Sequence, residues 1–304
     1  MYDITGVGYS CLDRICTIDD YPPEDGSTHI SQIQTQGGGA AATAVVAASR
    51  LGKKTTFIGL AGFDGASEDI RKLFEMDGVD TSNLVKTEGI TGLQSFVMVD
   101  PKSGSRTKFP QRDEQPPIKW TAQLESVIAS SKAIHLDGTH HENAMEAARI
   151  AKKHGVLISL DGCHLKDDNS LNLELAKMAD ILIMNYRYPV RVTGIQDYDQ
   201  ALLECAKWGA KVVIGTKGSE GCRAVIDGRV EYFPAFKVKA VDTTGAGDVF
   251  HGAFLAGWLD GMGLKECIRF ASAVAAVKCT AFGGRAGIPS KEAALRFIDQ
   301  VKTF

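Results

Sequence analysis

The residues with the clearest chemical potential lie in one run, from Val241 to Phe254. Gly245, Ala246 and Gly247 stand at the start of an apolar stretch that predicts a helix, and Asp248 follows them directly. The first N–H groups of a helix lack internal partners and the helix dipole favours negative charge there, so this turn predicts a site for a phosphoryl group. A carboxylate in the same turn is placed to accept the proton of an attacking hydroxyl. The run therefore predicts phosphoryl transfer with Asp248 as general base, although in isolation it also fits an ordinary glycine turn followed by a first-turn acid.

This run differs from two widespread phosphate-binding motifs. The glycines are not followed by the Gly-Lys-Ser/Thr of a Walker loop, and their spacing does not match the six-residue dinucleotide fingerprint. The interpretation therefore depends on the elements that position the turn.

Most of the chain alternates a short β-branched run, a turn and a helical stretch. Strands are expected at 3–9, 55–60, 132–136, 156–160, 181–184 and 211–215, and helices at 40–51, 67–76, 142–153 and through most of the chain after 245. Asp227-Gly228 is a strong hairpin signal. Near-continuous apolar strands that alternate with helices predict a doubly wound α/β fold, in which a mostly parallel sheet is covered by helices on both faces.

Two segments, at about 12–36 and 91–110, interrupt this alternation with strands and turns and no helix between them. Each alternates apolar and polar residues, which is typical of a half-buried sheet. We expect a small antiparallel β lid that stands off the main domain, with an edge extension of the main sheet as the alternative. Because the two segments are far apart in the sequence, the lid is predicted to be an insertion into a single domain that spans residues 1–304.

Two longer runs resemble the signatures of a known family. Residues 242–253, Asp-Thr-Thr-Gly-Ala-Gly-Asp-Val-Phe-His-Gly-Ala, resemble the C-terminal signature of the ribokinase-type (pfkB) carbohydrate kinases, and residues 37–52 resemble the N-terminal signature. The signatures occur in the family's order, with matching strands between them. The resemblance covers essentially the whole chain and implies a ribokinase-like fold.

The resemblance also implies roles for individual residues. The last Asp of the C-terminal signature is the family's base and the Gly-Ala-Gly backbone forms its anion hole, so these roles would fall to Asp248 and to residues 245–247. Asp242 and Thr244 would lie near a monovalent cation, such as potassium, that orders the loop.

On the sugar side, the resemblance places Gly38 and Gly39 at the hinge between lid and main domain. Asp13 matches a family Asp that holds two sugar hydroxyls, a natural task for a carboxylate, although an exposed loop acid is its ordinary alternative. Thr43 stands where the family often has Asn, so one hydrogen bond is kept and the pairing of an amide is lost.

On the nucleotide side, a glycine-rich turn follows the strand predicted at 211–215 and resembles the family's nucleotide loop. Asn185 matches the Asn of the family's Asn-x-x-Glu element, whose Glu helps to organise water around magnesium. Tyr188 occupies the Glu position here, which puts that assistance in doubt, although Mg²⁺ should still be needed to neutralise the triphosphate of ATP. The residues that the resemblance assigns to the ATP site are Asn185, Thr216, Gly218, Gly221 and Thr243.

Several runs look especially like the sulfofructose kinase branch of the family. That branch has Lys, Asn and Arg where this chain has Ser27, Lys108 and Thr139, so much of the charge-assisted pairing that a sulfonate needs is missing. Arg106, Lys108 and Arg112 are candidates for replacement charge. The sequence favours a ketose or related polyol that is uncharged or differently substituted, with sulfofructose as an open alternative.

Bulk properties exclude some classes of function. The chain has 304 residues and a formal net charge of -3, which gives no general attraction to nucleic acid or anionic membranes. No apolar stretch approaches a membrane span, and the first residues do not resemble a secretion signal. Seven cysteines without a CxxC pair fit a reduced cytoplasmic compartment, in which they serve as small buried hydrophobes. His135, His140 and His141 lie near the end of a predicted strand and are interpreted mainly as solvated loop histidines, with substrate contact by the last two as the alternative.

Three functions remain for the structure to weigh. The first is an ATP-dependent sugar kinase, which the resemblance implies to be a homodimer built through the lid strands. The second is a nucleoside kinase of the same family, which predicts an aromatic wall in the lid, with Tyr21, Phe96 and Phe109 as candidates. The third is a catalytically idle sugar sensor, which predicts a damaged base or anion hole and is disfavoured by the intact residues 245–248.

Overall fold

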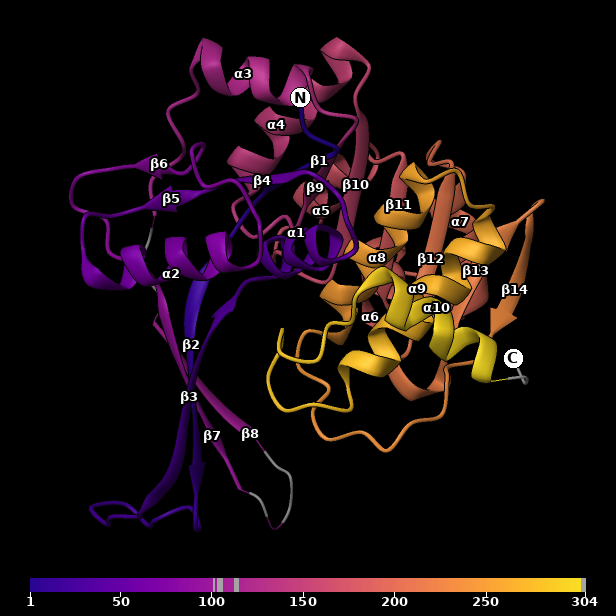
Figure 1. Cartoon of the computed structure of the whole chain (residues 1–304). Coiled ribbons are helices and arrows are strands. Elements are labelled where there is room, and N and C mark those ends of the chain that lie inside the picture. The colour runs from indigo at the N-terminus through magenta and orange to yellow at the C-terminus, as the bar shows by residue number, and fades with distance from the viewer. Residues whose placement is uncertain (101, 103–105, 112–114, 302–304) are drawn as a thin grey trace.

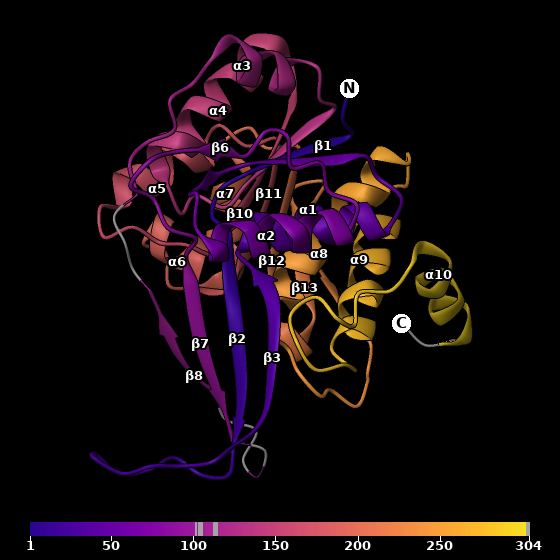
Figure 2. The ribbon, with the colours of Figure 1, turned by 60° about the vertical axis from the view of Figure 1, so that its left-hand side comes forward.

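The computed structural model describes residues 1–100, 102, 106–111 and 115–301. Its body is an eight-stranded sheet with helices on both faces, and a four-stranded sheet projects from one side of that body (Figures 1 and 2). The predicted fold class, a mostly parallel doubly wound sheet with a small second sheet, is confirmed, although the small sheet was expected to be antiparallel and one of its three strand pairs is parallel.

The large sheet has the order β14-β13-β12-β11-β10-β9-β1-β4. The six strands from β12 to β4 are parallel, and β13 and β14 complete the sheet as an antiparallel hairpin. The hairpin turns at Asp227 and Gly228, whose φ angles of 49° and 74° match the predicted turn. The strands are β1 (Ile4–Val7), β4 (Thr55–Ile58), β9 (Ala133–Leu136), β10 (Leu157–Gly162), β11 (Ile181–Asn185), β12 (Val212–Thr216), β13 (Cys222–Ile226) and β14 (Arg229–Phe233).

Helices cover both faces because the central strands are apolar on both sides. In β11, Ile181 and Ile183 join one hydrophobic cluster while Leu182 and Met184 join the other. The first cluster packs against α1 (Ala40–Arg50), α2 (Gly65–Met76), α8 (Ala246–Leu259), α9 (Leu264–Lys278) and α10 (Lys291–Gln300). The second packs against α3 (Ala122–Ala129), α4 (His141–His154), α5 (Asn169–Ala176), α6 (Arg187–Thr193) and α7 (Tyr198–Ala206).

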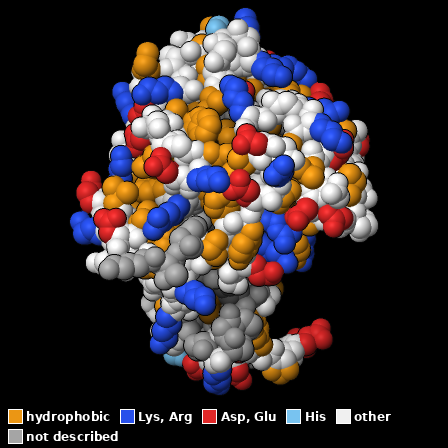
Figure 3. Space-filling view, turned by 90° about the vertical axis from the view of Figure 1, so that its right-hand side faces the viewer, with side chains coloured by type: hydrophobic (Ala, Val, Ile, Leu, Met, Phe, Trp, Pro, Cys, Tyr) orange, Lys and Arg blue, Asp and Glu red, His pale blue; other side chains and the backbone are white. Residues whose placement is uncertain are grey.

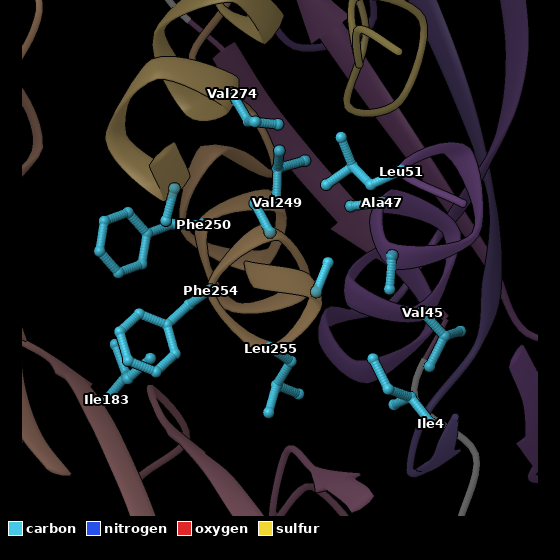
Figure 4. Packing of buried hydrophobic residues seen from close by; sticks show 14 of the residues in the cluster. Ile4, Val45, Ala47, Leu51, Ile183, Val249, Phe250, Phe254, Leu255 and Val274 are labelled. Carbon is cyan, nitrogen blue, oxygen red and sulfur yellow. The ribbon is translucent and has the colours of Figure 1, made fainter. Parts of the chain in front are cut away.

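Helices α1 and α8 lie side by side in the first cluster, as Figure 4 shows for Val45, Ala47, Val249 and Leu255. A Cβ atom on Gly252 of α8 would lie 2.1 Å from the carbonyl oxygen of Ala44, so only glycine allows this approach. The alanine-rich sequence of α1 therefore serves close packing against α8.

The four-stranded sheet has the order β3-β2-β7-β8 and is formed by the two predicted insertions. Its outer pairs are antiparallel, while the central pair β2–β7 is parallel because both strands leave the body in the same direction. Its strands are β2 (Cys11–Ile18), β3 (Ile30–Gly38), β7 (Gln94–Val99) and β8 (Arg106–Pro110); two short strands, β5 (Leu60–Ala61) and β6 (Val85–Lys86), pair elsewhere.

The two faces of the four-stranded sheet differ. Ile15, Val97 and Val99 are buried and pack against Phe282 in the C-terminal part of the body, so their face, here called the inner face, is turned toward the body. Asp13 shares this face, because it is two residues from Ile15 along the same strand. The other, outer face carries exposed apolar side chains, namely those of Ile33, Phe96 and Phe109.

The surface is mixed in charge. Over the face in Figure 3, Lys and Arg side chains are interspersed with Asp and Glu. No helix in the described ranges has both the length and the apolar character that a membrane crossing requires.

Candidate functional site

The turn at the start of α8 has the geometry expected of an anion site. Gly245 is the N-cap with φ 72°, and because it is a glycine it has no side chain that could accept a hydrogen bond from the first turn of the helix. A Cβ atom on Gly245 would lie 3.0 Å from the carbonyl oxygen of Gly284, whereas a Cβ atom on Gly247 would meet nothing within 4 Å. The helix tip therefore opens toward free space at Gly247, with Asp248 in the same turn.

The carboxyl group of Asp248 is poised to titrate near neutral pH. Burial is the main cause that raises its pKa to about 7, and the charge of Asp161 adds to it. His251 and His164 act in the opposite direction and limit the rise. A carboxyl group with this pKa is a far stronger base than an ordinary aspartate and is still largely ionised just above neutrality.

A buried contact between a histidine and an aspartate acts on Asp248. Nε2 of His251 lies 3.3 Å from Oδ1 of Asp161, and both side chains are almost fully buried. Burial opposes ionisation of Asp161, but the charge and hydrogen bond of His251 outweigh it and keep the pKa of Asp161 below its usual range. Asp161 therefore stays negative beside Asp248, which explains part of the upward shift there.

The three histidines singled out in the sequence have different environments. His135 lies inside β9, is fully buried, and its Nδ1 lies 3.1 Å from the hydroxyl of Ser159, so the interpretation as a loop histidine is wrong for this residue. Burial is the main cause that lowers the pKa of His135 to about 3. His140 and His141 do follow the strand, at the start of α4, and both are partly buried.

Asp137, at the carboxyl end of β9, binds the start of α1. Its Oδ2 accepts hydrogen bonds from the backbone N–H of Tyr9 at 3.1 Å and of Ala41 at 3.2 Å, and its Oδ1 accepts one from Thr139 at 2.9 Å. The charge of Asp137 also contributes to the raised pKa of Asp248. The tip of α1 is thus filled by a carboxylate of the protein itself.

Asp13 stands on the inner face of the four-stranded sheet, next to the glycine run. A Cβ atom on Gly38 would lie 2.4 Å from Oδ2 of Asp13, so the missing side chain makes room for the carboxylate. Gly39 has φ 100°, and a Cβ atom there would lie 2.1 Å from the carbonyl oxygen of Tyr9. Burial raises the pKa of Asp13, while its hydrogen bond with Cys11 and the charge of Lys108 act in the opposite direction.

Thr43 is bound by a buried arginine that joins three parts of the chain. Nε of Arg285 donates to Oγ1 of Thr43 at 3.2 Å, and its Nη2 donates to the carbonyl oxygen of Gly38 at 3.1 Å. Gly37 also needs to be glycine, because a Cβ atom there would overlap the guanidinium group. Thr43 thus lies between the four-stranded sheet and the tip of α8, where its methyl carbon is 3.5 Å from the position of a Cβ atom on Gly245.

Four of the five residues predicted for the nucleotide lie at the ends of two neighbouring strands or in the turn that follows them. Asn185 and Thr216 are directly paired in the register of β11 and β12, and a 3₁₀ turn (Gly218–Glu220) follows. Gly218 and Gly221 both have positive φ, at 56° and 82°. Thr243 is exposed in the loop before α8.

Tyr188 is buried in the second hydrophobic cluster, and its hydroxyl donates to the carbonyl oxygen of Asn172 at 3.2 Å. It therefore does not replace the acidic group that the family has at this position. The amide oxygen of Asn185 accepts hydrogen bonds from the backbone N–H of Arg187 and Tyr188 and so fixes the start of α6.

The loop that leads into α8 contains the two residues expected at a potassium site. Nζ of Lys278 donates to the carbonyl oxygen of Asp242 at 2.9 Å and to that of Thr244. The carboxylate of Asp242 accepts hydrogen bonds from the backbone N–H of Thr244 at 2.8 Å and of Gly283 at 3.0 Å. These residues fit a potassium ion poorly, because an ammonium group already lies against the carbonyl oxygens that would bind it.

Four charged residues of this region were not predicted from the sequence. For two of them, the position relative to a predicted strand could have indicated a role. Asp137 and Asp161 each follow or end a buried apolar strand, and the carboxyl ends of parallel strands are where α/β proteins bind ligands. Lys278 and Arg285 lie in runs that support the family resemblance, but nothing local distinguishes them from surface residues.

Comparisons with known proteins agree with this geometry. The family model described as "pfkB family carbohydrate kinase" matches residues 1–291. A nucleoside kinase from Methanothermobacter thermautotrophicus is 31% identical over 307 residues, which cover 98% of this chain and 96% of the relative. The crystal structure of a putative ribokinase from Agrobacterium tumefaciens has a TM-score of 0.90 at 28% identity and covers 98% of this chain and 97% of its own. A ribokinase from Arabidopsis thaliana, complexed with ribose and ATP, has a TM-score of 0.84 at 24% identity and covers 98% of both chains.

Proposed function

Because this chain belongs to the pfkB family of carbohydrate kinases and is therefore a phosphotransferase with a hydroxyl acceptor, we propose that it transfers the γ-phosphoryl group of ATP to a hydroxyl of a small sugar. The observation that carries the proposal is the start of α8, where Asp248 stands beside an uncapped glycine-led helix tip. A family relative that acts on nucleosides and a structural neighbour that binds ribose and ATP are consistent with a sugar hydroxyl as acceptor.

In this proposal Asp248 accepts the proton of the attacking hydroxyl. Its pKa of about 7 suits that task, because the carboxylate is present near neutral pH and still binds a proton well. The backbone N–H groups of Gly245 and Gly247 are proposed to donate to the charge that grows on the transferred phosphoryl group, while the N–H of Ala246 donates to the carbonyl oxygen of Thr243 at 3.2 Å. Gly247 leaves space for that group, since no atom lies within 4 Å of the Cβ position.

The sugar is proposed to lie between the inner face and the tips of α1 and α8. Asp13 accepts hydrogen bonds from two of its hydroxyls. Gly38 and Gly39 support this site, because Gly38 leaves room for the carboxylate of Asp13 and Gly39 lets the chain pass against the carbonyl oxygen of Tyr9. Thr43 retains one hydroxyl for substrate while Arg285 holds it in place.

ATP is proposed to bind along the carboxyl ends of β11 and β12, at Asn185, Thr216, Gly218, Gly221 and Thr243. Gly218 fits this role, because a Cβ atom there would meet nothing within 4 Å and the position is open to a ligand. Gly221 lets the turn pass close to β14, since a Cβ atom there would lie 2.1 Å from the carbonyl oxygen of Phe233. Mg²⁺ neutralises the triphosphate when it is bound. With Tyr188 buried, the ion has to be held by the nucleotide and by acids other than a residue at that position.

The four-stranded sheet is proposed to act as a lid on a single domain and to exclude water from the transfer. Its outer face carries Ile33, Phe96 and Phe109, which are 63%, 42% and 54% exposed. Exposed apolar side chains on an open sheet favour pairing with a second copy, so we propose a homodimer through this face. The seven free thiols fit the reducing cytoplasm as the place of action.

The second candidate is a nucleoside kinase, favoured by the Methanothermobacter relative. It needs an aromatic wall on the substrate side of the lid. Phe96 and Phe109 are cross-strand neighbours on the outer face, opposite to Asp13, so they do not line the chain's own site. Tyr21 is exposed and donates to the carbonyl oxygen of Met98. The arrangement of the lid therefore favours a sugar without a base.

Sulfofructose is supported less well than a neutral sugar. Lys108 does belong to the inner face, through its pairing with Val97, and its charge acts on Asp13. Arg112 lies outside the described residues, and Arg106 contributes only its backbone to β8 in the described part. A single lysine is a weak substitute for the bidentate arginine that a sulfonate prefers.

The test is ATP consumption across ketoses, aldoses, their phosphates, sulfofructose and nucleosides, with the wild type, Asp248→Asn and the control Asp69→Asn on the exposed side of α2. We expect turnover with a neutral sugar that falls about 10²–10⁴-fold in Asp248→Asn, with nucleotide binding retained, and is unchanged in Asp69→Asn. Equal rates in the wild type and Asp248→Asn would remove Asp248 as the base. A preference for nucleosides would select the second candidate, and nucleotide binding without turnover on any acceptor would favour the idle sensor.

A further inference from the structure

A lysine is buried completely at the end of α9. The side chain of Lys278 has no exposed surface, and its ammonium group donates to the carbonyl oxygens of Asp242 and Thr244. A fully buried lysine is rare, because removing an ammonium group from water is costly unless its charge is matched. The carboxylate of Asp242 supplies that match. Burial acts to raise the pKa of Asp242, but hydrogen bonds from Thr244 and Gly283, together with the charge of Lys278, lower it and keep the group negative.

The two carbonyl groups belong to the segment that leads directly into the tip of α8. Thr244 directly precedes the N-cap Gly245. Hydrogen bonds to neighbouring residues also fix the position of Asp242. Its backbone N–H and that of Val241 donate to the carbonyl oxygen of Cys279, at 3.2 and 2.7 Å, and its carboxylate accepts from Gly283. Whatever holds residues 242–244 therefore sets the position of the N–H groups that follow.

We propose that Lys278 is a tethered cation that positions the anion-binding turn, so that this protein needs no monovalent metal ion there. The proposal rests on the proposed function for its kinetic consequence. Potassium is bound in proteins by converging carbonyl oxygens that replace its water shell. Here the same kind of oxygens converge on an ammonium group, which is a compact point charge with three donors.

A tethered ammonium group differs from a bound ion in one measurable way. An ion occupies its site in proportion to its concentration, whereas Lys278 is attached to α9 and is present at any salt composition. The wild type is therefore expected to be insensitive to the identity of the monovalent cation. A variant without the ammonium group should instead acquire sensitivity to ions of suitable size.

The experiment compares the wild type, Lys278→Ala and the control Lys265→Ala in buffers that contain potassium, ammonium, sodium or tetramethylammonium chloride at about 0.1 M, where surface charge effects are similarly screened. Lys265 lies at the exposed start of the same helix and pairs with Glu231. Turnover and thermal unfolding are both measured, because unfolding responds to an ion bound at the site even if no substrate is known.

For the wild type and Lys265→Ala, we expect less than a twofold difference in turnover among the salts and no difference in Tm. For Lys278→Ala, we expect turnover to fall roughly 10²-fold, as for the loss of one oriented donor. Potassium or ammonium should restore at least a tenth of it and raise Tm, while tetramethylammonium should do neither.

Strong activation or stabilisation of the wild type by potassium would overturn the proposal, and this arm needs no variant. Loss of turnover in Lys278→Ala without any recovery of turnover or Tm in potassium or ammonium would also overturn it, since the lysine would then be only a packing element. If Lys278→Ala does not fold, Lys278→Met, which keeps the length of the side chain, is used in its place. If no acceptor is phosphorylated at all, the proposed function fails. The Tm values in the different salts still show whether Lys278 takes the place of a monovalent ion.

Discussion

Helices α1 and α8 lie side by side and begin in the same way, yet their tips are used differently. Each starts at a glycine N-cap with positive φ, Gly39 at 100° and Gly245 at 72°, and neither glycine offers a side chain to cap the helix. At α1 the carboxylate of Asp137 accepts a hydrogen bond from the second residue of the helix. At α8 the tip opens at Gly247 beside a carboxyl group whose pKa is raised. The same backbone device therefore serves structure in one helix and an anionic ligand in the other.

Five of the other helices show the kind of cap that α1 and α8 lack, whereas α4 and α9 also begin without a side-chain cap. Five helices, α2, α3, α5, α7 and α10, begin at a residue whose side chain accepts a hydrogen bond from the helix's own first turn, namely Asp64, Thr121, Asp168, Asp197 and Ser290. In a helix capped in this way, one of the first-turn N–H groups already donates to the cap side chain and cannot bind an anion. Helix α8 has no such side-chain cap, and although the N–H of Ala246 donates to the carbonyl oxygen of Thr243, we expect the N–H groups that follow in the first turn to bind a phosphoryl group.

The largest expected effect follows from Gly39→Ala at the start of α1. The residue has φ 100° and ψ 138°, a region that is almost restricted to glycine, and the new methyl group would lie 2.1 Å from the carbonyl oxygen of Tyr9. We expect a loss of several kcal/mol in the free energy of unfolding, on the order of 3 or more, measured by chemical denaturation.

The matched control is Gly52→Ala, at the other end of the same helix. Its φ is 90°, but a Cβ atom there would meet nothing within 4 Å, so it isolates the backbone strain from the steric overlap. A destabilisation by Gly39→Ala no greater than that of Gly52→Ala would show that the tip of α1 is not tightly fixed.

The second largest effect is expected from Gly247→Ala at the tip of α8. Alanine favours a helix over glycine by up to about 1 kcal/mol, and no atom obstructs the methyl group, so we expect Tm to stay the same or rise. The methyl group would stand in the space proposed for the phosphoryl group, so we expect kcat to fall by about 10²-fold or more. Steady-state kinetics and thermal unfolding of the same preparation measure both effects.

Gly65→Ala serves as the control, because Gly65 is the first residue of α2, is equally unobstructed, and follows the side-chain cap Asp64. Turnover should not change in this variant. Full activity of Gly247→Ala would contradict the assignment of the α8 tip as the phosphoryl site.

The α8 tip could be predicted from the sequence, whereas most of the contacts around it could not. Gly245 to Asp248 are adjacent in the chain, so their spacing alone predicts an anion site with a base. Asp137 acts on α1 only because the sheet places β9 beside β1, and the parallel pairing of β2 with β7 depends on where two distant insertions leave the body. Lys278 ends a helix that has exposed positions as well as buried ones, and no local pattern shows that this lysine turns inward. What could not be predicted are thus contacts between segments that are far apart in the sequence.

The smallest expected effect concerns pH and separates the catalytic tip from the rest of the fold. The pKa of Asp248 is about 7 in the folded protein, above its ordinary value, so the folded state binds a proton more tightly than the unfolded chain. The stabilisation from that proton is present at low pH and is lost as the pH rises toward 7. Turnover has the opposite dependence, because the base acts only when it is ionised, so kcat/KM should rise with pH up to about 7 and then level off.

Asp248→Asn removes this proton equilibrium while it keeps the size of the side chain. We expect its Tm to exceed that of the wild type by about 2–4 °C at pH 8, as for a change near 1 kcal/mol, and by less at pH 5, where the wild-type carboxyl group is itself protonated. Differential scanning calorimetry at the two pH values measures the difference, with Asp69→Asn as the control. A Tm difference that is the same at both pH values would mean that Asp248 has an ordinary pKa, and the α8 tip would then lack the feature that distinguishes it from the tip of α1.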